Sequence, residues 1–244
     1  ELQRKFINPE LCDITEALVY TEPYNDELKR NHVFPPIAEF VKETLYDDQE
    51  LHCEVAKLKM DFMTRAQSLI HGDLHTGSVF INEESTKVFD PEFCFYGPMG
   101  YDIGNVIANM IFAWANGDAA GAEEFCNWVE NVLVDVVNMT KEKMEKYYEE
   151  HVTDTMCKNE LYRKYYMATI IEDTSAVTGL ELIRRIVGMA NVKDITSIED
   201  EAKRARAEKI CITAAVDFIK NRGDKKCGKC FLGTLKDAIA KVDA

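Results

Sequence analysis

The chain is 244 residues long, which allows one or two domains and a sizeable hydrophobic core. Apolar residues make up 46% and charged residues 30%, a composition typical of a soluble globular protein. The net charge of −14 argues against nucleic acid or an anionic membrane as a partner, although local arginines or a metal ion could still bind a phosphorylated substrate. The longest apolar stretch, residues 106–115, contains Asn109 and is too short to cross a bilayer.

Helical periodicity dominates the chain outside one central segment. Residues 1–24 predict a short amphipathic piece with turns, and residues 25–36 a polar loop. Asp48 is placed to cap a helix that leads into the central segment. The stretches with helical spacing are residues 37–46, 51–62, 101–114, 119–137, 140–151, 154–190, 198–220 and 233–242.

Three features are predicted to divide these helices. One helix is expected to end before Asn138, and Gly179 is expected to break the stretch 154–190. Ser197 with Asp200 resembles a capping box for the helix that follows.

The central segment, residues 69–93, reads LIHGDLHTGSVFINEESTKVFDPEF. Residues 79–81 predict a short buried strand, residues 83–86 a polar turn, and residues 87–89 the returning strand. The segment therefore predicts one small β-hairpin in a mostly helical chain.

The hairpin is expected to bring Asp90 and Glu92 close to Asp73, which lies on a tight loop beside a glycine. In an extended chain Asp90 and Glu92 would point the same way. Three such carboxylates suit a kinase, in which one accepts the proton of a substrate hydroxyl while the others hold Mg²⁺ on the nucleotide phosphates. An acidic surface turn is the alternative that Asp90-Pro91-Glu92 alone would favour.

Residues 93–101 contain two glycines and a proline and predict a loop. Asp102 then stands in the first turn of the next helix, where its charge complements the helix dipole.

Arg184 and Arg185 stand between apolar residues of a predicted helix. From spacing alone, twin arginines on a helix are expected to be solvated or to pair with a nearby acid such as Glu181. The apolar neighbours on both sides predict instead that the arginines are at least partly buried. A buried guanidinium requires an anionic partner.

Most of the eight cysteines lie in apolar helical patterns, where cysteine behaves as a small hydrophobic residue. This usage favours reduced thiols and a cytoplasmic location. Cys227 and Cys230 have the spacing of zinc ligands, but no second pair accompanies them and their setting is rich in lysine and glycine. Spacing alone does not establish a metal or redox role for them.

The residues from His71 to His75 resemble the catalytic loop of small-molecule kinases related to aminoglycoside phosphotransferases and choline kinase. Longer motifs resemble the methylthioribose kinases in particular, and the resemblance runs from about residue 6 to about residue 218. These motifs are HGDLHTGS from His71, DPEF from Asp90, YGP from Tyr96, DIG from Asp102 and ELIRR from Glu181.

This resemblance implies an α+β fold that is mostly α: the C-terminal lobe of a protein-kinase-like fold, with a small β-hairpin at the active site. It implies ATP-dependent phosphorylation of the 1-hydroxyl of 5-methylthioribose, a step of methionine salvage. Asp73 would orient the acceptor hydroxyl and accept its proton, and Arg184 and Arg185 would bind substrate and stabilise the transferring phosphoryl group.

The resemblance also implies a Mg²⁺ site at Asp90, Glu92 and Ser78. Most of these kinases carry asparagine where this chain has Ser78, so one metal ion would be held less tightly or through water. Supporting roles around the catalytic loop fall to three residues, His71, His75 and Asp102.

A kinase of this kind needs a nucleotide-binding lobe with a loop over the phosphates. The first 70 residues contain no glycine, and nothing in the chain matches a P-loop. Residues 1–244 are therefore expected to be the catalytic and substrate-binding lobe without the N-terminal lobe, inactive or weakly active alone. The resemblance further suggests a homodimer.

Two alternatives stay open. One is another small-molecule kinase that acts on choline, an aminoglycoside or homoserine, against which Ser78 and the arginine pair count. The other is a non-catalytic lobe that binds a sugar, against which the intact Asp73, Asp90 and Glu92 count.

Overall fold

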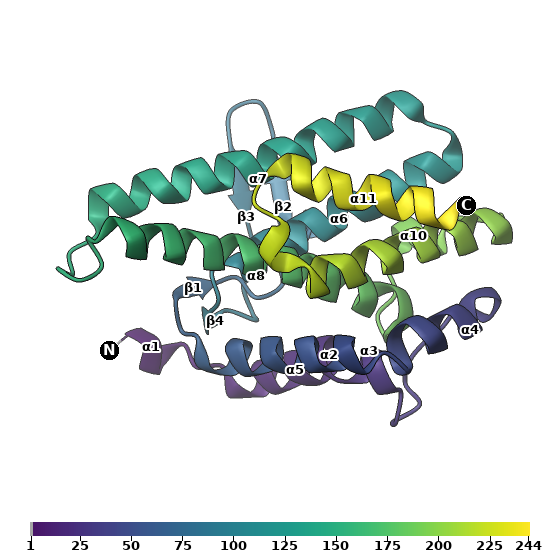
Figure 1. Cartoon of the computed structure of the whole chain (residues 1–244), viewed down its shortest axis with the longest axis horizontal. Coiled ribbons are helices and arrows are strands. Elements are labelled where there is room, and N and C mark those ends of the chain that lie inside the picture. The colour runs from purple at the N-terminus through teal and green to yellow at the C-terminus, as the bar shows by residue number, and fades with distance from the viewer. Residues whose placement is uncertain (1) are drawn as a thin grey trace.

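The computed structural model describes residues 2–244 as a mostly helical fold with two small antiparallel sheets (Figure 1). The helices are α1 Leu2–Lys5, α2 Pro9–Tyr20, α3 Glu22–Asn25, α4 Ala38–Val41, α5 Gln49–Thr64, α6 Gly100–Ala120, α7 Glu123–His151, α8 Glu160–Val187, α9 Lys193–Thr196, α10 Glu201–Lys220 and α11 Gly228–Val242. Short 3₁₀ turns at Pro35–Ile37, Thr76–Ser78 and Arg222–Asp224 and a π-helical turn at Lys42–Tyr46 complete the helical segments.

Helix α8 is the central element of the fold. It packs against α6 and α10, while α7 and α11 contact each other and cover α6 and α10 (Figure 1). Helices α2 and α5 form a second layer, in which α2 reaches α8 and α5 reaches α10. Almost every residue of α8 from Ile170 to Val187 is buried, because the helix has neighbours on several sides.

Helix α5 forms as its apolar spacing predicts. The Asp48 carboxylate accepts a hydrogen bond from the Leu51 N–H at 2.9 Å, so it caps the helix. Phe62 on the buried face of α5 meets the rings of Phe95 and Tyr101, with centroids 4.9 and 5.6 Å away. These contacts place the end of α5 against strand β4 Phe95–Gly97 and the start of α6, which follow the predicted active-site hairpin.

Two predicted helix breaks are wrong. Helix α7 continues through Asn138, whose side chain accepts a hydrogen bond from the Gly228 N–H at 2.9 Å. Helix α8 continues through Gly179, where a Cβ atom would lie 2.5 Å from the Ala215 carbonyl oxygen. Gly179 therefore serves the close packing of α8 on α10, and its place in the sequence does not distinguish this role from a helix break.

The predicted capping box is also wrong in part. The Asp200 carboxylate accepts hydrogen bonds from the Ala202 and Lys203 N–H groups and caps α10 alone. Ser197 instead lies beside Asn116, whose side-chain amide donates to the Ser197 hydroxyl at 3.3 Å.

The predicted hairpin is confirmed as strands β2 Val79–Ile81 and β3 Thr86–Val88, with Val79 opposite Val88. Its strands are not buried, contrary to the prediction: Phe80 is 65% exposed and stacks on Phe89 with ring centroids 4.4 Å apart. The hairpin projects from the helical layers (Figure 1).

A second sheet replaces part of the predicted loop over residues 93–101. Strand β4 Phe95–Gly97 pairs with β1 Ser68–Ile70, so that Ile70 lies opposite Phe95. This pairing joins segments more than twenty residues apart and brackets the catalytic loop.

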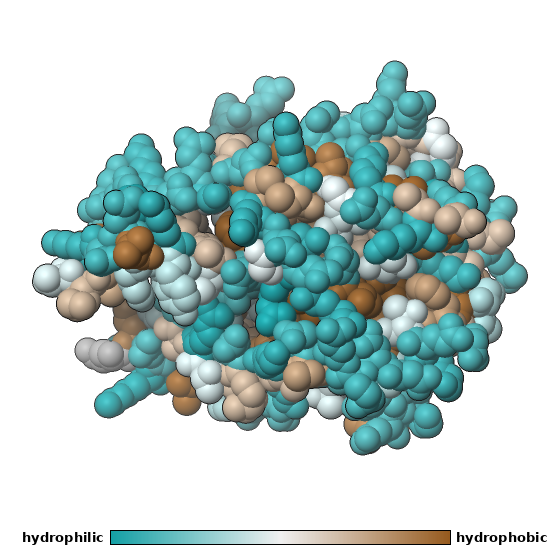
Figure 2. Space-filling model, in the orientation of Figure 1, coloured by the Kyte–Doolittle hydropathy of each residue, from teal (hydrophilic) through white to brown (hydrophobic). Residues whose placement is uncertain are grey.

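Among residues 2–244, the helices lack the combination of length and apolar character that crossing a bilayer requires. The face shown in Figure 2 is largely hydrophilic, with apolar side chains scattered over it.

A buried ion pair joins α8 to the end of α5. Arg65 Nη1 donates to Asp173 Oδ1 at 2.8 Å, and the Asp173 side chain is only 9% exposed. The other oxygen, Oδ2, has no hydrogen-bond partner among the described residues. Burial raises the pKa of Asp173 to about 6, and the nearby Arg65 only partly offsets this rise.

Asp173 should therefore make the fold less stable as the pH rises from about 4 to about 6. The folded state keeps the proton over this window while the unfolded state, with an ordinary pKa near 3.8, has lost it. Relative to Asp173→Asn, the wild-type free energy of unfolding should fall by on the order of 3 kcal/mol across the window. Urea titrations at several pH values would measure this, and parallel pH profiles for the two proteins would contradict it.

Asp61→Asn is the matched control. Asp61 also lies beside Arg65, at 3.6 Å, but its side chain is 47% exposed. Its charge contributes to the raised pKa of Asp173 less than burial does, so its replacement should change the pH profile in the same direction as Asp173→Asn but by much less.

Candidate active site

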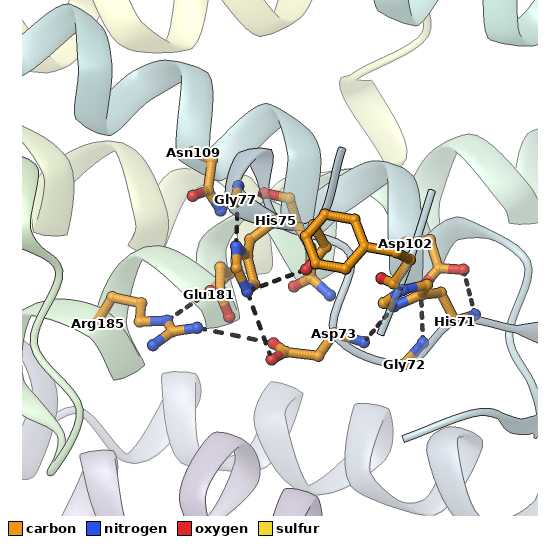
Figure 3. Close-up of polar contacts among 12 residues, drawn as sticks. His71, Gly72, Asp73, His75, Gly77, Asp102, Asn109, Glu181 and Arg185 are labelled. Carbon is orange, nitrogen blue, oxygen red and sulfur yellow. Dashed lines mark hydrogen bonds and ion pairs between the residues drawn. The ribbon is translucent and has the colours of Figure 1, made fainter. Parts of the chain in front are cut away.

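Asp102 at the start of α6 fixes the backbone of the loop that carries Asp73. Its carboxylate accepts hydrogen bonds from the His71 N–H at 2.7 Å and the Gly72 N–H at 2.9 Å (Figure 3). Burial raises the pKa of Asp102, and the two N–H groups oppose the rise by stabilising the carboxylate. Asp102 thus contacts the backbone of the loop, in addition to standing in the first turn of its helix.

Gly72 allows the loop to turn sharply before Asp73. Its φ of +86° lies in the left-handed region, and a Cβ atom at this position would lie 2.3 Å from the Phe93 carbonyl oxygen. The loop and the segment after the hairpin therefore touch through backbone atoms.

Gly72→Ala should destabilise the protein by about 3 kcal/mol or more, because a strained φ and a backbone clash add together. Gly121→Ala is the matched control: Gly121 has a φ of +73°, but a Cβ there would meet nothing within 4 Å. We expect it to cost only about 1 kcal/mol. Chemical denaturation of both variants would measure the difference, and equal losses would show that the Phe93 contact does not matter.

The Asp73 carboxylate faces the end of α8. Arg184 Nη2 donates to Asp73 Oδ1 at 3.0 Å. Arg185 Nη2 lies 3.7 Å from the same oxygen (Figure 3). His75 Nε2 lies 3.9 Å from Oδ2. The Asp73 side chain is 29% exposed, so it still reaches solvent although it contacts the arginines.

Glu181 holds both arginines, one helical turn before them on α8. Its carboxylate accepts hydrogen bonds from Arg184 and from Arg185 Nε, the latter at 3.0 Å. The Glu181 side chain is 1% exposed. Burial opposes its ionisation, but the two arginines outweigh this effect and hold the pKa of Glu181 below its ordinary value.

The arginine pair thus satisfies both expectations from sequence. The side chains are 13% and 21% exposed, and they pair with the nearby acid as well as with Asp73. Burial would lower the pKa of Arg184, but Glu181 reverses this and raises it. From the sequence, Glu181 is expected only to form a salt bridge with the arginines. Its (i, i+3) and (i, i+4) spacing to Arg184 and Arg185 is the signal that could have identified it as the residue that holds both.

The two histidines hold the loop together. His71 Nε2 lies 2.9 Å from the Phe89 carbonyl oxygen, so it must be the donor in that contact. His75 Nδ1 accepts from the Gly77 N–H at 3.0 Å, and His75 Nε2 lies 3.2 Å from the Ser78 hydroxyl. These contacts are those of residues that order a loop.

The three predicted metal ligands are in different settings. Ser78 is 3% exposed, and its hydroxyl contacts His75. Asp90 and Glu92 are exposed, and neither forms an ion pair with a described residue. Asp90 has a φ of +68°, so the chain is not extended there and the argument that both side chains point the same way is wrong.

Within residues 2–244, no three or more histidine, cysteine or acidic side chains gather as a ready metal site. Mg²⁺ commonly binds one or two carboxylates together with water and substrate phosphates. The unpaired Asp90 and Glu92 carboxylates fit that requirement.

A cavity of about 50 Å³ lies beside Asp73 and Arg184. Helix α2 forms one wall with mainly apolar side chains, and the catalytic loop forms the other. The cavity is lined by Ile14, Thr15, Leu18, Val19, Gly72, Asp73, Phe93, Tyr101 and Arg184. It is therefore polar at the carboxylate and apolar towards α2.

Several known proteins have sequences similar to this chain. Methylthioribose kinase 1 from Oryza sativa subsp. japonica is 36% identical over 234 residues, which is 88% of this chain and 54% of that protein. Methylthioribose kinase from Erwinia tasmaniensis is 39% identical over 244 residues, 98% of this chain and 57% of that protein. Methylthioribose kinase from Bacillus pumilus is 36% identical over 217 residues, which is 89% of this chain and 53% of that protein.

The chain spans about half the length of these curated relatives. The family described as "Phosphotransferase enzyme family" matches residues 6–131 of this chain. This range is more than half of the chain and includes the whole catalytic loop and hairpin. The chain belongs to the phosphotransferase enzyme family.

Proposed function

We propose that the chain carries the acceptor site of an ATP-dependent kinase that phosphorylates 5-methylthioribose at its 1-hydroxyl, a step of methionine salvage. The observation that carries the proposal is the group formed by Asp73, Arg184 and Arg185, with the loop backbone held by Asp102. This group places a partly exposed carboxylate beside two fixed positive charges. In a kinase that acts on a sugar hydroxyl, the carboxylate can serve as the base and the positive charges can stabilise the transferring phosphoryl group.

In the proposed reaction, Asp73 orients the anomeric hydroxyl of the sugar and accepts its proton. An anomeric hydroxyl is more acidic than an ordinary alcohol, so a carboxylate is a sufficient base when the transfer occurs late. Arg184 and Arg185 stabilise charge on the transferring phosphoryl group, and arginines in this role can be worth about 10³-fold in rate.

A magnesium ion, when bound, would neutralise charge on the nucleotide phosphates. Asp90 and Glu92 would hold it, and their exposure without ion-pair partners among the described residues favours this assignment. Ser78 would contribute less, because its hydroxyl is buried against His75.

The apolar wall of the small cavity supports an acceptor with an apolar substituent. Ile14 and Leu18 face the same cavity as Asp73. A sugar that places its hydroxyl at Asp73 could rest a methylthio group against α2, whereas choline or an aminoglycoside would bring a cation towards Arg184.

We assign to residues 1–244 the role of the catalytic and substrate-binding lobe of a protein-kinase-like fold. The nucleotide-binding part would correspond to the portion of the relatives that this chain does not match. A cytoplasmic location stays a prediction from the cysteine usage, and a homodimer stays a prediction from the resemblance.

A chimera tests the proposal. In the Bacillus pumilus enzyme, the matched segment, 53% of that protein, would be replaced by this chain. We expect ATP-dependent transfer to methylthioribose, with little transfer to ribose or choline. Preference for choline would indicate another small-molecule kinase.

Calorimetry on the 244-residue chain alone gives a second readout that does not depend on the chimera folding. It should detect binding of methylthioribose. An inactive chimera together with a chain that binds the sugar would favour the non-catalytic alternative, and the absence of both would overturn the proposal.

A further inference from the structure

Cys227 and Cys230 lie together at the start of α11, with their sulfur atoms 2.9 Å apart. Cys227 is the last extended residue before the helix, and the Cys230 N–H donates to the Cys227 carbonyl oxygen at 2.9 Å. Both thiols are free and half-buried. A disulfide bond is about 2.05 Å long, so small side-chain rotations could close one without moving the helix.

The segment that carries the pair is anchored on two other helices. The Gly228 N–H donates to Asn138 Oδ1 on α7 at 2.9 Å, and Lys225 Nζ donates to Asp217 Oδ2 on α10 at 2.5 Å. A Cβ atom on Gly228 would lie 2.3 Å from the Val134 carbonyl oxygen, so the backbone lies directly on α7. These contacts fix the backbone that carries the two thiols.

The surroundings of the pair favour a thiolate. Lys225, Lys226 and Lys229 fall within the same short segment, in a chain whose net charge is −14. The Cys227 side chain and nearby backbone N–H groups at the helix start lower the pKa of Cys230. By contrast, burial raises the pKa of four other cysteines, Cys12, Cys126, Cys157 and Cys211.

A cavity of about 250 Å³ borders this segment, between α7 and α8. Its charged residues are four lysines and two glutamates: Lys141, Lys164, Lys225, Lys226, Glu145 and Glu172. Two of these lysines are ion-paired, Lys164 with Glu160 and Lys225 with Asp217, so the charges of the cavity itself nearly balance. Lys226 and Lys229 flank the two cysteines in the sequence and form no ion pair with a described residue, so the positive charge beside the thiols suits a small anionic molecule better than a cationic one.

We propose that Cys227 and Cys230 form a reactive dithiol site that takes small anionic disulfides of the glutathione disulfide type. The Cys230 thiolate attacks one sulfur of the disulfide, forms a mixed disulfide and releases one thiolate. Cys227, after losing its proton, attacks the Cys230 sulfur and displaces the second thiolate. The protein loses two electrons to the added disulfide, and the products are an internal Cys227–Cys230 disulfide and two small thiols.

This site is separate from Asp73 and its arginines, and its assignment does not depend on phosphoryl transfer. The test uses the folded 244-residue chain in buffers with increasing ratios of glutathione disulfide to glutathione. Samples are quenched with acid, alkylated and digested with trypsin. Cleavage after Lys226 and Lys229 puts the two cysteines on separate peptides, which stay joined only through a disulfide.

We expect the joined peptides to form at ratios that leave the other six cysteines open to alkylation. Cys227→Ser should trap glutathione on Cys230, and Cys230→Ser should slow the reaction at this site about tenfold. The cationic disulfide cystamine should react more slowly than glutathione disulfide at low salt. Cys53→Ser, which removes an exposed cysteine elsewhere, is the matched control.

Three results would overturn the proposal. The pair could stay reduced under conditions in which Cys53 forms a mixed disulfide. Cys230 in the Cys227→Ser protein could react no faster than Cys53. Cystamine could react as fast as glutathione disulfide, which would remove the assignment to anionic disulfides.

Discussion

Replacing Asp73 with asparagine should reduce phosphoryl transfer to methylthioribose by about 10³-fold or more while sugar binding changes little. Asparagine keeps the shape of the side chain and can still accept a hydrogen bond from Arg184, but it cannot take up the proton of the acceptor hydroxyl. The loss should therefore appear in kcat, with KM for the sugar nearly unchanged. The chimera with the Bacillus pumilus enzyme provides the kinetic readout.

The fold should tolerate this change. Arg184 keeps Glu181 as an anionic partner when the charge of Asp73 is removed, so no guanidinium is left without compensation. Asp13→Asn, at an exposed position on α2, is a suitable control for the loss of one negative charge. An Asp73→Asn protein that loses sugar binding but keeps its turnover would contradict the role assigned to Asp73.

Local features of the fold could be predicted from the sequence because local physics decides them. Asp48 caps α5 in the way its position predicts, and the turn after Ile81 pairs β2 with β3. The approximate positions of most helices follow from their apolar spacing. The contact between Asp102 and the catalytic loop followed from the resemblance.

Features that depend on distant residues could not be predicted. Gly179 is a packing contact with α10, and Asn138 is a partner of Gly228, but in the sequence both resemble helix breaks. Strand β4 exists because β1 pairs with it, although Gly97 and its neighbours have the composition of a loop. The positive φ at Asp90 is likewise not signalled by the residues beside it in the sequence.

In the candidate site, too, some features could be predicted from the sequence and others could not. The motif identifies Asp73 and the arginines, and helical spacing predicts that Glu181 pairs with the arginines. Only the fold shows that Asp73, more than a hundred residues earlier, joins them in one charged group at the end of α8. The group has two acids and two arginines, so its charges balance within a largely apolar setting. Removing one member should then affect both stability and function.

Glu181→Gln should destabilise the protein by about 3–5 kcal/mol at neutral pH, because it leaves two partly buried guanidinium groups with Asp73 as their main counter-ion. Because the pKa of Glu181 is lowered in the folded state, its contribution is present above the ordinary pKa of a glutamate. It is lost as the pH falls through the folded-state pKa. Urea titrations at neutral and acidic pH should therefore give a difference between wild type and variant that shrinks in acid.

The affinity for methylthioribose should fall together with stability, since the arginines lose their anchor. Adding Arg185→Met to Glu181→Gln should recover part of the lost stability by restoring the charge balance with Asp73. Recovered stability without recovered sugar affinity would assign Arg185 a direct contact with substrate. An Arg185→Met change that adds to the loss would contradict the charge-balance argument.

Glu208 on α10 provides a matched control for Glu181. It is equally buried at 1% exposure and pairs with one arginine, Arg204, at the same (i, i+4) spacing. Here burial outweighs the single arginine and raises the pKa of Glu208, so ionisation of this residue lowers the stability of the fold. Glu208→Gln should therefore hardly change the free energy of unfolding and should leave sugar binding intact. A loss of stability equal to that of Glu181→Gln would show that burial alone, not the second arginine, determines the effect.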